Sequence, residues 1–345
     1  MIAPFPYFGG KSVIAHEVWT RFGDVANYVE PFAGSLAVLL NRPHPAKIET
    51  INDLDGLVTN FWRALQHDPE GVARHATNPV NECDLHARHA YLLKVKPEFE
   101  ARLCGDPEFY DSKLAGWWAW GTSCWIGSGL CSGEGAWQSV DGMLVKLAPR
   151  TGNKKKLPHL GTAGTGVTKQ LPHLGDAGKG VTKQLPHLGD AGKGDEETAP
   201  GPFDPSVGLL DWMYALANRI RTVRVCCGDW TRVLGPSVTS KFGLTGIFLD
   251  PPYGHDMRAA GLYANDSVDV TAAVGEWCKS NGNNNLLRIA LAGYEGEYDL
   301  PGWKVMPWKA RGGMGNQGAG RGRDNASLER IWFSPYCLGS GLFDE

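Results

Sequence analysis

Residues 23–41 read Gly-Asp-Val-Ala-Asn-Tyr-Val-Glu-Pro-Phe-Ala-Gly-Ser-Leu-Ala-Val-Leu-Leu-Asn. The apolar residues around Tyr28 and Val29 predict a short strand, and a Pro/Gly turn then leads into a helix starting near Ser35, a suitable N-cap. A glycine lets the backbone approach a ligand, and a helix N-terminus offers free N–H groups. Strand, glycine turn and helix therefore predict the opening of a nucleotide-binding α/β unit. Taken alone, the pattern fits an ordinary turn equally well.

The segments further along the chain extend this unit into an alternation of strands and helices. After Ile51-Asn52-Asp53-Leu54-Asp55, apolar residues recur at helical spacing from Leu54 to Leu65. Asp53 or Asp55 stands at the helix start, where the helix dipole favours a carboxylate. Further helices are expected at 84–104, 107–120 and 209–220, and strands at 222–226, 246–249, 288–292 and 330–333. This alternation implies an α/β sheet covered by helices on both faces.

The composition is that of a folded protein. Of 345 residues, 42% are hydrophobic and 21% charged, which excludes wholesale disorder and leaves material for a sizeable core. The chain lacks a run of about 18 apolar residues and a visible signal peptide, so we expect no membrane association and a cytoplasmic location. The net charge of −3 means that contact with nucleic acid must come from local basic patches. The eight cysteines include no CxxC pair, so no metal site is expected.

The strongest chemical signal is Asp250-Pro251-Pro252-Tyr253, which follows the apolar strand at 246–249. Ligand sites of open α/β sheets lie at the carboxyl ends of strands. Two consecutive prolines fix the backbone and leave carbonyls without neighbouring N–H donors. An exocyclic amino group can therefore donate one hydrogen to the Asp250 carboxylate and one to the Pro251 carbonyl, while the Tyr253 ring stacks on a planar base. The plainer alternative is a proline-stiffened strand exit with a capping aspartate.

A third stretch, residues 6–12, ends in Gly10-Lys11-Ser12 like a phosphate-binding P-loop. That motif needs a glycine five positions before Gly10, where Phe5 stands, and a preceding strand, which is not expected here. We therefore reject a P-loop ATPase, which would show ATP-dependent activity that is lost in Lys11→Ala.

Four motifs taken together resemble the Dam-like DNA adenine-N6 methyltransferases. They are, in order, Tyr-Phe-Gly-Gly-Lys at 7–11, Glu-Pro-Phe-Ala-Gly-Ser at 30–35, Asn-Asp-Leu-Asp at 52–55 and Asp-Pro-Pro-Tyr at 250–253. The resemblance covers roughly residues 1–65 and 205–336, and residues 66–205 match it by position alone. The turn has less glycine than in many relatives. The middle region lacks an expected Arg/Asn-rich stretch, which leaves the recognised DNA sequence open.

The resemblance implies a Rossmann-like domain that binds S-adenosylmethionine, without a metal. It would transfer a methyl group by in-line attack of the N6 amino nitrogen of an adenine flipped out of double-stranded DNA. Tyr7 and Lys11 would contact the cofactor beside the catalytic pocket, Asp53 would bind its ribose hydroxyls and Asp229 would face its adenine. The turn under its methionine part would comprise Glu30, Pro31, Phe32, Ala33, Gly34 and Ser35. The catalytic residues would be Asp250, Pro251, Pro252 and Tyr253, with Asp250 also beside the cofactor.

The motif order divides the chain into three parts. Residues 1–65 and 205–345 would form the catalytic domain, and residues 66–149 a mostly helical target-recognition domain. Residues 150–204 would be a basic, glycine-rich insertion, in which Leu-Pro-His-Leu-Gly occurs three times at a 14-residue period. This insertion either contacts DNA phosphates or is a solvated segment without a role. The four tryptophans within 117–125 form either a helical core or a wedge into DNA.

Other functions stay open on the sequence alone. Methylation of cytosine at N4, or of adenine in RNA, would use the same chemistry on a similar amino group. A cofactor-binding but inactive DNA-binding regulator would show no turnover. The expected partner is double-stranded DNA, with a restriction nuclease as a candidate second partner in a bacterial or phage restriction-modification setting, and a monomer is favoured.

Overall fold

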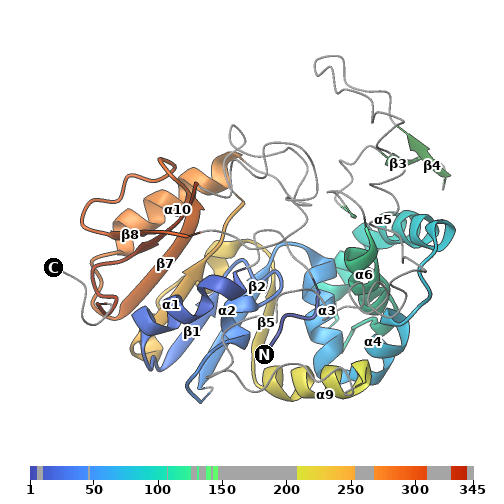
Figure 1. Cartoon of the computed structure of the whole chain (residues 1–345), viewed down its shortest axis with the longest axis horizontal. Helices are drawn as coiled ribbons and strands as arrows, with labels where there is room; N and C mark the ends of the chain where they lie inside the picture. The colour runs from blue at the N-terminus through green and yellow to red at the C-terminus, as the bar shows by residue number, and fades with distance from the viewer. Residues whose placement is uncertain are drawn as a thin grey trace, which may run out of the picture.

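The computed structural model describes residues 1–5, 11–45, 47–106, 108–125, 130–131, 137–140, 143–146, 208–252, 268–308 and 328–339. At its centre is a seven-stranded sheet in the order β5-β2-β1-β6-β7-β9-β8 (Figure 1). Its strands are β1 (Asn27–Glu30), β2 (Ile48–Asp53), β5 (Arg224–Cys227), β6 (Thr245–Leu249), β7 (Leu287–Tyr294), β8 (Lys304–Pro307) and β9 (Glu329–Phe333). The predicted α/β class is confirmed.

The strand order reverses beside β1. Five strands, from β5 to β7 in the sheet order, run parallel, whereas β9 is antiparallel to both β7 and β8. The chain runs outward from β1 through β2 to β5, and then returns to β6 on the other side of β1. Ligands of open α/β sheets bind at such a reversal, outside the carboxyl ends of the strands. This topology therefore places a binding crevice at the ends of β1 and β6.

Helices and shorter elements surround the sheet. The helices are α1 (Ser12–Phe22), α2 (Ala37–Leu40), α3 (Gly56–His67), α4 (Pro69–Ala76), α5 (Glu82–Gly105), α6 (Ser112–Cys124), α9 (Leu209–Ile220) and α10 (Val268–Asn281). Two 3₁₀ helices, η3 (Trp230–Val233) and η4 (Ser240–Phe242), and a hairpin of β3 (Trp137–Val140) and β4 (Met143–Lys146) complete the described part. None of the described helices combines the length and apolarity needed to cross a bilayer.

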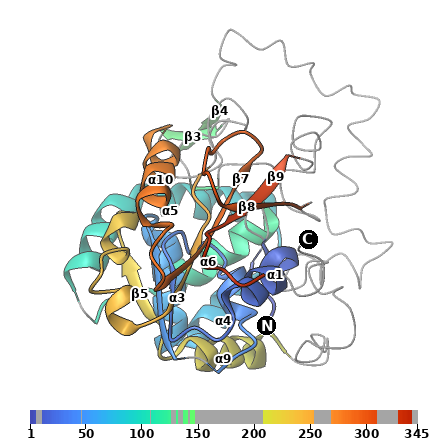
Figure 2. The same cartoon turned by 90° about the vertical axis from the view of Figure 1, so that its left-hand side faces the viewer.

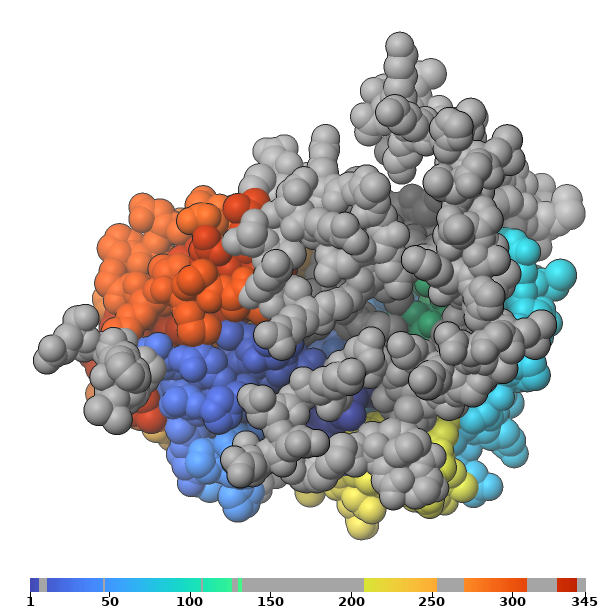
Figure 3. Space-filling view, viewed as in Figure 1, coloured from blue at the N-terminus to red at the C-terminus, as the bar shows by residue number. Residues whose placement is uncertain are grey.

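Both faces of the sheet are buried. Because side chains alternate along a strand, Tyr28 and Phe248 pack into a cluster with α1, whereas Val29, Ile247 and Leu249 pack into a second cluster with α10. Figure 2 shows α1 and α10 on opposite sides of the sheet. In Figure 3 the surface of residues 268–308 borders that of the N-terminal residues, in keeping with the contact between α1 and β7. The expectation of helices on both faces is confirmed.

The helices between β2 and β5 share the buried cluster of one sheet face. α3, α4, α6 and α9 pack against one another, and α3 also packs on β2 and β5. Trp118 and Trp120 of α6 are 4% and 1% exposed. Such burial makes these two tryptophans core residues rather than a wedge into DNA. The division of the chain into domains stays a prediction.

Local structure departs from the sequence-based expectations in several places. The helix expected near Ser35 is a single turn, and it begins at Ala37. Its N-cap is Leu36 rather than Ser35, with a φ of 56°, because the turn after Gly34 (φ 45°) carries the chain through the left-handed region. Leu54, expected on the buried stripe of α3, precedes the helix and is 50% exposed. Tyr7, Tyr253 and the repeats of 157–194 lie outside the described residues.

Candidate active site

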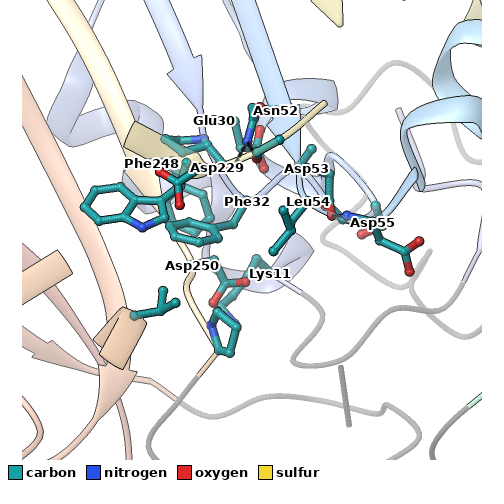
Figure 4. Close-up of a pocket in the computed structure, with 18 of the residues that line it drawn as sticks. Lys11, Glu30, Phe32, Asn52, Asp53, Leu54, Asp55, Asp229, Phe248 and Asp250 are labelled. Atoms are coloured by element: carbon teal, nitrogen blue, oxygen red, sulfur yellow. Dashed lines mark hydrogen bonds and ion pairs between the residues drawn. The ribbon is translucent and has the colours of Figure 1, made fainter. Parts of the chain in front are cut away.

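A pocket of about 930 Å³, including its open mouth, lies at the carboxyl ends of β1, β2, β5 and β6. Figure 4 shows Lys11 and Asp250 meeting on one side of it, and Asp53, Leu54 and Asp55 on another. Its described lining includes five carboxyl side chains and a single lysine. The pocket therefore favours a ligand with positive charge or with hydroxyl donors.

The catalytic candidate Asp250 is paired with a buried cation. Lys11 Nζ lies 2.9 Å from Asp250 Oδ1, and the two side chains are 5% and 15% exposed. The same Nζ lies 5.3 Å from the centre of the Trp308 ring. The Thr271 hydroxyl donates to the Pro252 carbonyl at 2.8 Å, which anchors the backbone after Asp250 to α10. Asp250 is thus held from both its side chain and its backbone.

Glu30 lies at the end of β1, beneath the turn. Its Oε2 accepts a hydrogen bond from the Tyr28 hydroxyl at 2.9 Å. Burial raises the pKa of Glu30 well above its ordinary range; the Tyr28 hydrogen bond opposes that rise, and the nearby Asp250 carboxylate adds to it. Burial therefore makes the protonated form of Glu30 more favourable than that of an exposed carboxyl group.

The turn after β1 is fixed by residues at the end of β2. Asn52 Nδ2 donates to the Pro31 carbonyl at 3.1 Å and to the Gly228 carbonyl at 2.8 Å, so it joins the segments that follow β1 and β5. Asp53 Oδ2 accepts the Gly34 N–H at 3.0 Å, and Asp53 Oδ1 accepts the Asp55 N–H at 2.9 Å. These bonds set the shape of the pocket wall.

The protonation of Asp53 is sensitive to its surroundings. Burial raises the pKa of Asp53 to about 7, although the N–H groups of Gly34 and Asp55 and the cation of Lys96 favour the charged form. Asp53 thus changes charge close to neutral pH.

An aromatic pair forms a further wall. The Phe32 and Trp230 rings are stacked, with centroids 6.0 Å apart and planes at 26°. Asp229 precedes Trp230 and caps η3, accepting the Thr231 N–H at 3.0 Å. A planar ligand beside these rings would find both an apolar face and a carboxylate.

The structure brings most of the predicted site residues into one place. Of the predicted site residues that the structure describes, all but Pro251 line the pocket, namely Lys11, Glu30, Pro31, Phe32, Ala33, Gly34, Ser35, Asp53, Asp229, Asp250 and Pro252. Pro251 is buried between two lining residues, and Tyr7 and Tyr253 lie outside the described residues. In the described ranges, no group of three His, Cys, Asp or Glu side chains is arranged to hold a metal ion.

Sequence reasoning missed three neighbours of the site. Trp230 directly follows the predicted Asp229, and Asn52 directly precedes Asp53, so both could have been found by their place at strand ends. Trp308, beside Lys11, directly follows the edge strand β8, which carries no clear pattern.

Comparison with known families gives this site a class. Residues 7–107 match the family model of the D12 class N6 adenine-specific DNA methyltransferases. The match confirms the resemblance to the Dam-like family. It also confirms the predicted enzyme class, a DNA adenine methyltransferase, whose substrate is DNA. A search of curated proteins found no matching relative.

Proposed function

We propose that this protein transfers a methyl group from S-adenosylmethionine to the N6 amino group of an adenine flipped out of double-stranded DNA, at a specific site. The observation that carries this proposal is the position of Asp250 at the end of β6, in a pocket shared with the turn of residues 30–35. The family match supports adenine as the target base and DNA as the substrate.

The pocket chemistry fits the cofactor. Its sulfonium and ammonium groups are positive, and the pocket is rich in carboxylates. Asp53 keeps acceptor capacity for ribose hydroxyls, because each of its carboxylate oxygens has two lone pairs and accepts one backbone N–H, from Gly34 or from Asp55. The Phe32–Trp230 pair offers a face for the adenine ring, and Asp229 lies next to it. When bound, the cofactor supplies the electrophilic methyl group.

Asp250 and its neighbours would orient the target amino group. The amino group donates a hydrogen to the Asp250 carboxylate, which draws charge onto the nitrogen and aims its lone pair. Lys11 fixes that carboxylate, and its positive charge favours the ionised form. The Thr271 bond to Pro252 fixes the backbone that carries the second acceptor, the Pro251 carbonyl. Positioning of this kind supplies the rate without a covalent intermediate.

The test is methyl transfer by the purified full chain. Labelled S-adenosylmethionine is added with DNA from a methylation-free host, and the digested product is separated by chromatography. We expect label in N6-methyladenine, with a loss of at least about 100-fold in Asp250→Asn, which removes the charged acceptor at constant size. The matched control Asp211→Asn alters an exposed carboxylate on α9 and should act like the wild type. Sequencing that detects modified bases then locates the site.

Each other outcome has a definite meaning. Label in N4-methylcytosine would identify cytosine, rather than adenine, as the target base. Label in RNA alone would identify RNA, rather than DNA, as the substrate. Binding of S-adenosylmethionine without transfer to any nucleic acid would identify an inactive regulator. A wild type that does not bind the cofactor would overturn the proposal as a whole.

A further inference from the structure

Helix α5 reaches the rim of the pocket through two charged side chains. Lys96 Nζ lies 3.2 Å from Asp55 Oδ1 and 3.7 Å from Glu100 Oε1. Glu100 Oε1 also accepts the Gly56 N–H at 3.3 Å. Lys96 and Asp55 are 15% and 14% exposed, so this pair is largely withdrawn from solvent. Asp55 lines the pocket, whereas Lys96 does not line it and contacts Asp55 instead.

We propose that Lys96 is a positioning residue for cofactor binding, acting through Asp55 on Asp53; this inference rests on the proposed function. Helix α5 would therefore form part of the cofactor site, although it lies in the segment between β2 and β5 that the sequence assigns to target recognition.

A continuous chain of contacts joins Lys96 to the pocket. The Asp55 oxygen held by Lys96 also accepts the Leu57 N–H at 2.9 Å, which caps α3. The Asp55 backbone N–H donates to Asp53 Oδ1, and the second Asp53 oxygen holds the Gly34 N–H. A shift of Asp55 would therefore move the Asp53 carboxylate and, with it, the glycine of the turn.

The close approach of α5 to this loop depends on Gly56. A Cβ at position 56 would lie 2.5 Å from Glu100 Cγ, closer than real contacts allow. Burial lowers the pKa of Lys96, but the carboxylates of Asp55 and Glu100 raise it more, so the lysine stays charged. Without that charge, two carboxylates would face each other across the loop, and their repulsion would displace Asp55.

Calorimetric titration of S-adenosylmethionine into the full chain, without DNA, tests the role of Lys96. We expect Lys96→Met to raise the Kd about tenfold, which corresponds to about 1.4 kcal/mol. Lys96→Arg keeps the charge and should restore most of the affinity. Lys94→Met, an exposed lysine on the same helix, is the matched control and should leave the Kd unchanged. At saturating cofactor, kcat of Lys96→Met should stay within about twofold of the wild type, since Lys96 does not touch the reacting groups.

A double-mutant cycle with Asp55→Asn tests the route. If Lys96 acts through Asp55, the two effects on Kd are less than additive; full additivity would overturn the proposed route. An unchanged Kd in Lys96→Met, with a wild type that binds, would overturn the inference and leave the proposed function intact. Failure of the wild type to bind would instead overturn the proposed function.

If Lys96→Met does not fold, Glu100→Gln takes its place, because the amide oxygen of the glutamine can still accept the Gly56 N–H. Loss of one of the two facing carboxylates should then strengthen the pairing of Lys96 with Asp55, and a Kd at least as low as that of the wild type is expected; a Kd raised tenfold would contradict the role assigned to the Lys96–Asp55 pair.

Discussion

Lys11 Nζ and Asp250 Oδ1 lie 2.9 Å apart in a buried ion pair, although the two residues come from segments far apart in the chain. The pairing means that the acidic group expected to receive the target base is already fixed before any ligand binds. It also places the lysine of the first motif against the last motif, whereas the resemblance assigned that lysine to the cofactor.

The first prediction concerns this ion pair. Lys11→Met should lower kcat by more than about tenfold and move the acid limb of the pH–rate profile upward, because Asp250 loses the cation that favours its ionised form. The measurement is methyl transfer between pH 5.5 and 8.5. The control Lys47→Met removes an exposed lysine paired with Asp24 at the surface and should leave the profile unchanged. An unshifted acid limb in Lys11→Met would refute a role in holding the charge of Asp250.

The second prediction concerns the aromatic wall. Phe32→Leu removes the stacked ring opposite Trp230 but keeps apolar volume, so we expect the Kd for S-adenosylmethionine to rise about five- to tenfold with little loss of stability. Titration calorimetry together with thermal melting separates the two effects. Phe242→Leu, in η4 away from the pocket, is the control. Equal affinity in Phe32→Leu and in the wild type would show that the cofactor does not use this wall.

The third prediction is a pH dependence. The pKa of Asp53 is raised to about 7, so the carboxylate is ionised above that pH and gains a proton below it. An ionised carboxylate is the stronger acceptor for ribose hydroxyls, and affinity for the cofactor should therefore fall as the pH falls through about 7. Asp53→Asn should bind more weakly at pH 8 and should lose most of this pH dependence. A wild-type affinity that is flat between pH 6 and 8 would contradict the assignment.

The fourth prediction concerns the buried ion pairs of Glu49 with Arg42 and Arg219. Glu49 of β2 pairs with Arg42 at 3.1 Å and with Arg219 of α9 at 2.7 Å, and its side chain is 1% exposed. Glu49→Gln leaves two guanidinium groups without their counter-charge, so the free energy of unfolding should fall by about 3 kcal/mol or more. Denaturant titration measures it. Asp24→Asn, at the exposed Lys47 pair, should change little. Equal stability of both variants would contradict a supporting role for Glu49.

Much of the fold followed from local sequence pattern. The strands β1, β6 and β7 are largely buried and have apolar residues at their centres, and α3 and α9 carry clear helical stripes, so the local pattern revealed them. The edge strand β8 is largely exposed and ends in Pro307. It therefore lacks the apolar pattern from which a strand can be predicted. Helices α1 and α10 were not anticipated.

The site was predictable as a set of motifs, but its contacts were not. Strand ends that carry Asp53, Asp229 and Asp250 meet because parallel strands share one edge, which the motif order implied. The partner of each group depends on packing between distant segments. No spacing rule links Lys11 to Asp250, or Lys96 of α5 to Asp55. The left-handed Leu36 likewise arises from tertiary packing, since Leu36 is fully buried and propensity alone disfavours that conformation.

The position of β1 between β2 and β6 also affects how the chain folds while it is being synthesised. On the ribosome, β1 and β2 emerge early, whereas β5 and β6, their remaining neighbours, follow only after the long segment between them has been synthesised. Until then, apolar strands with unpaired edges stay open to wrong partners, which slows folding and invites aggregation. Biogenesis of this protein should therefore depend on the rate of translation and on chaperones that shield nascent strands.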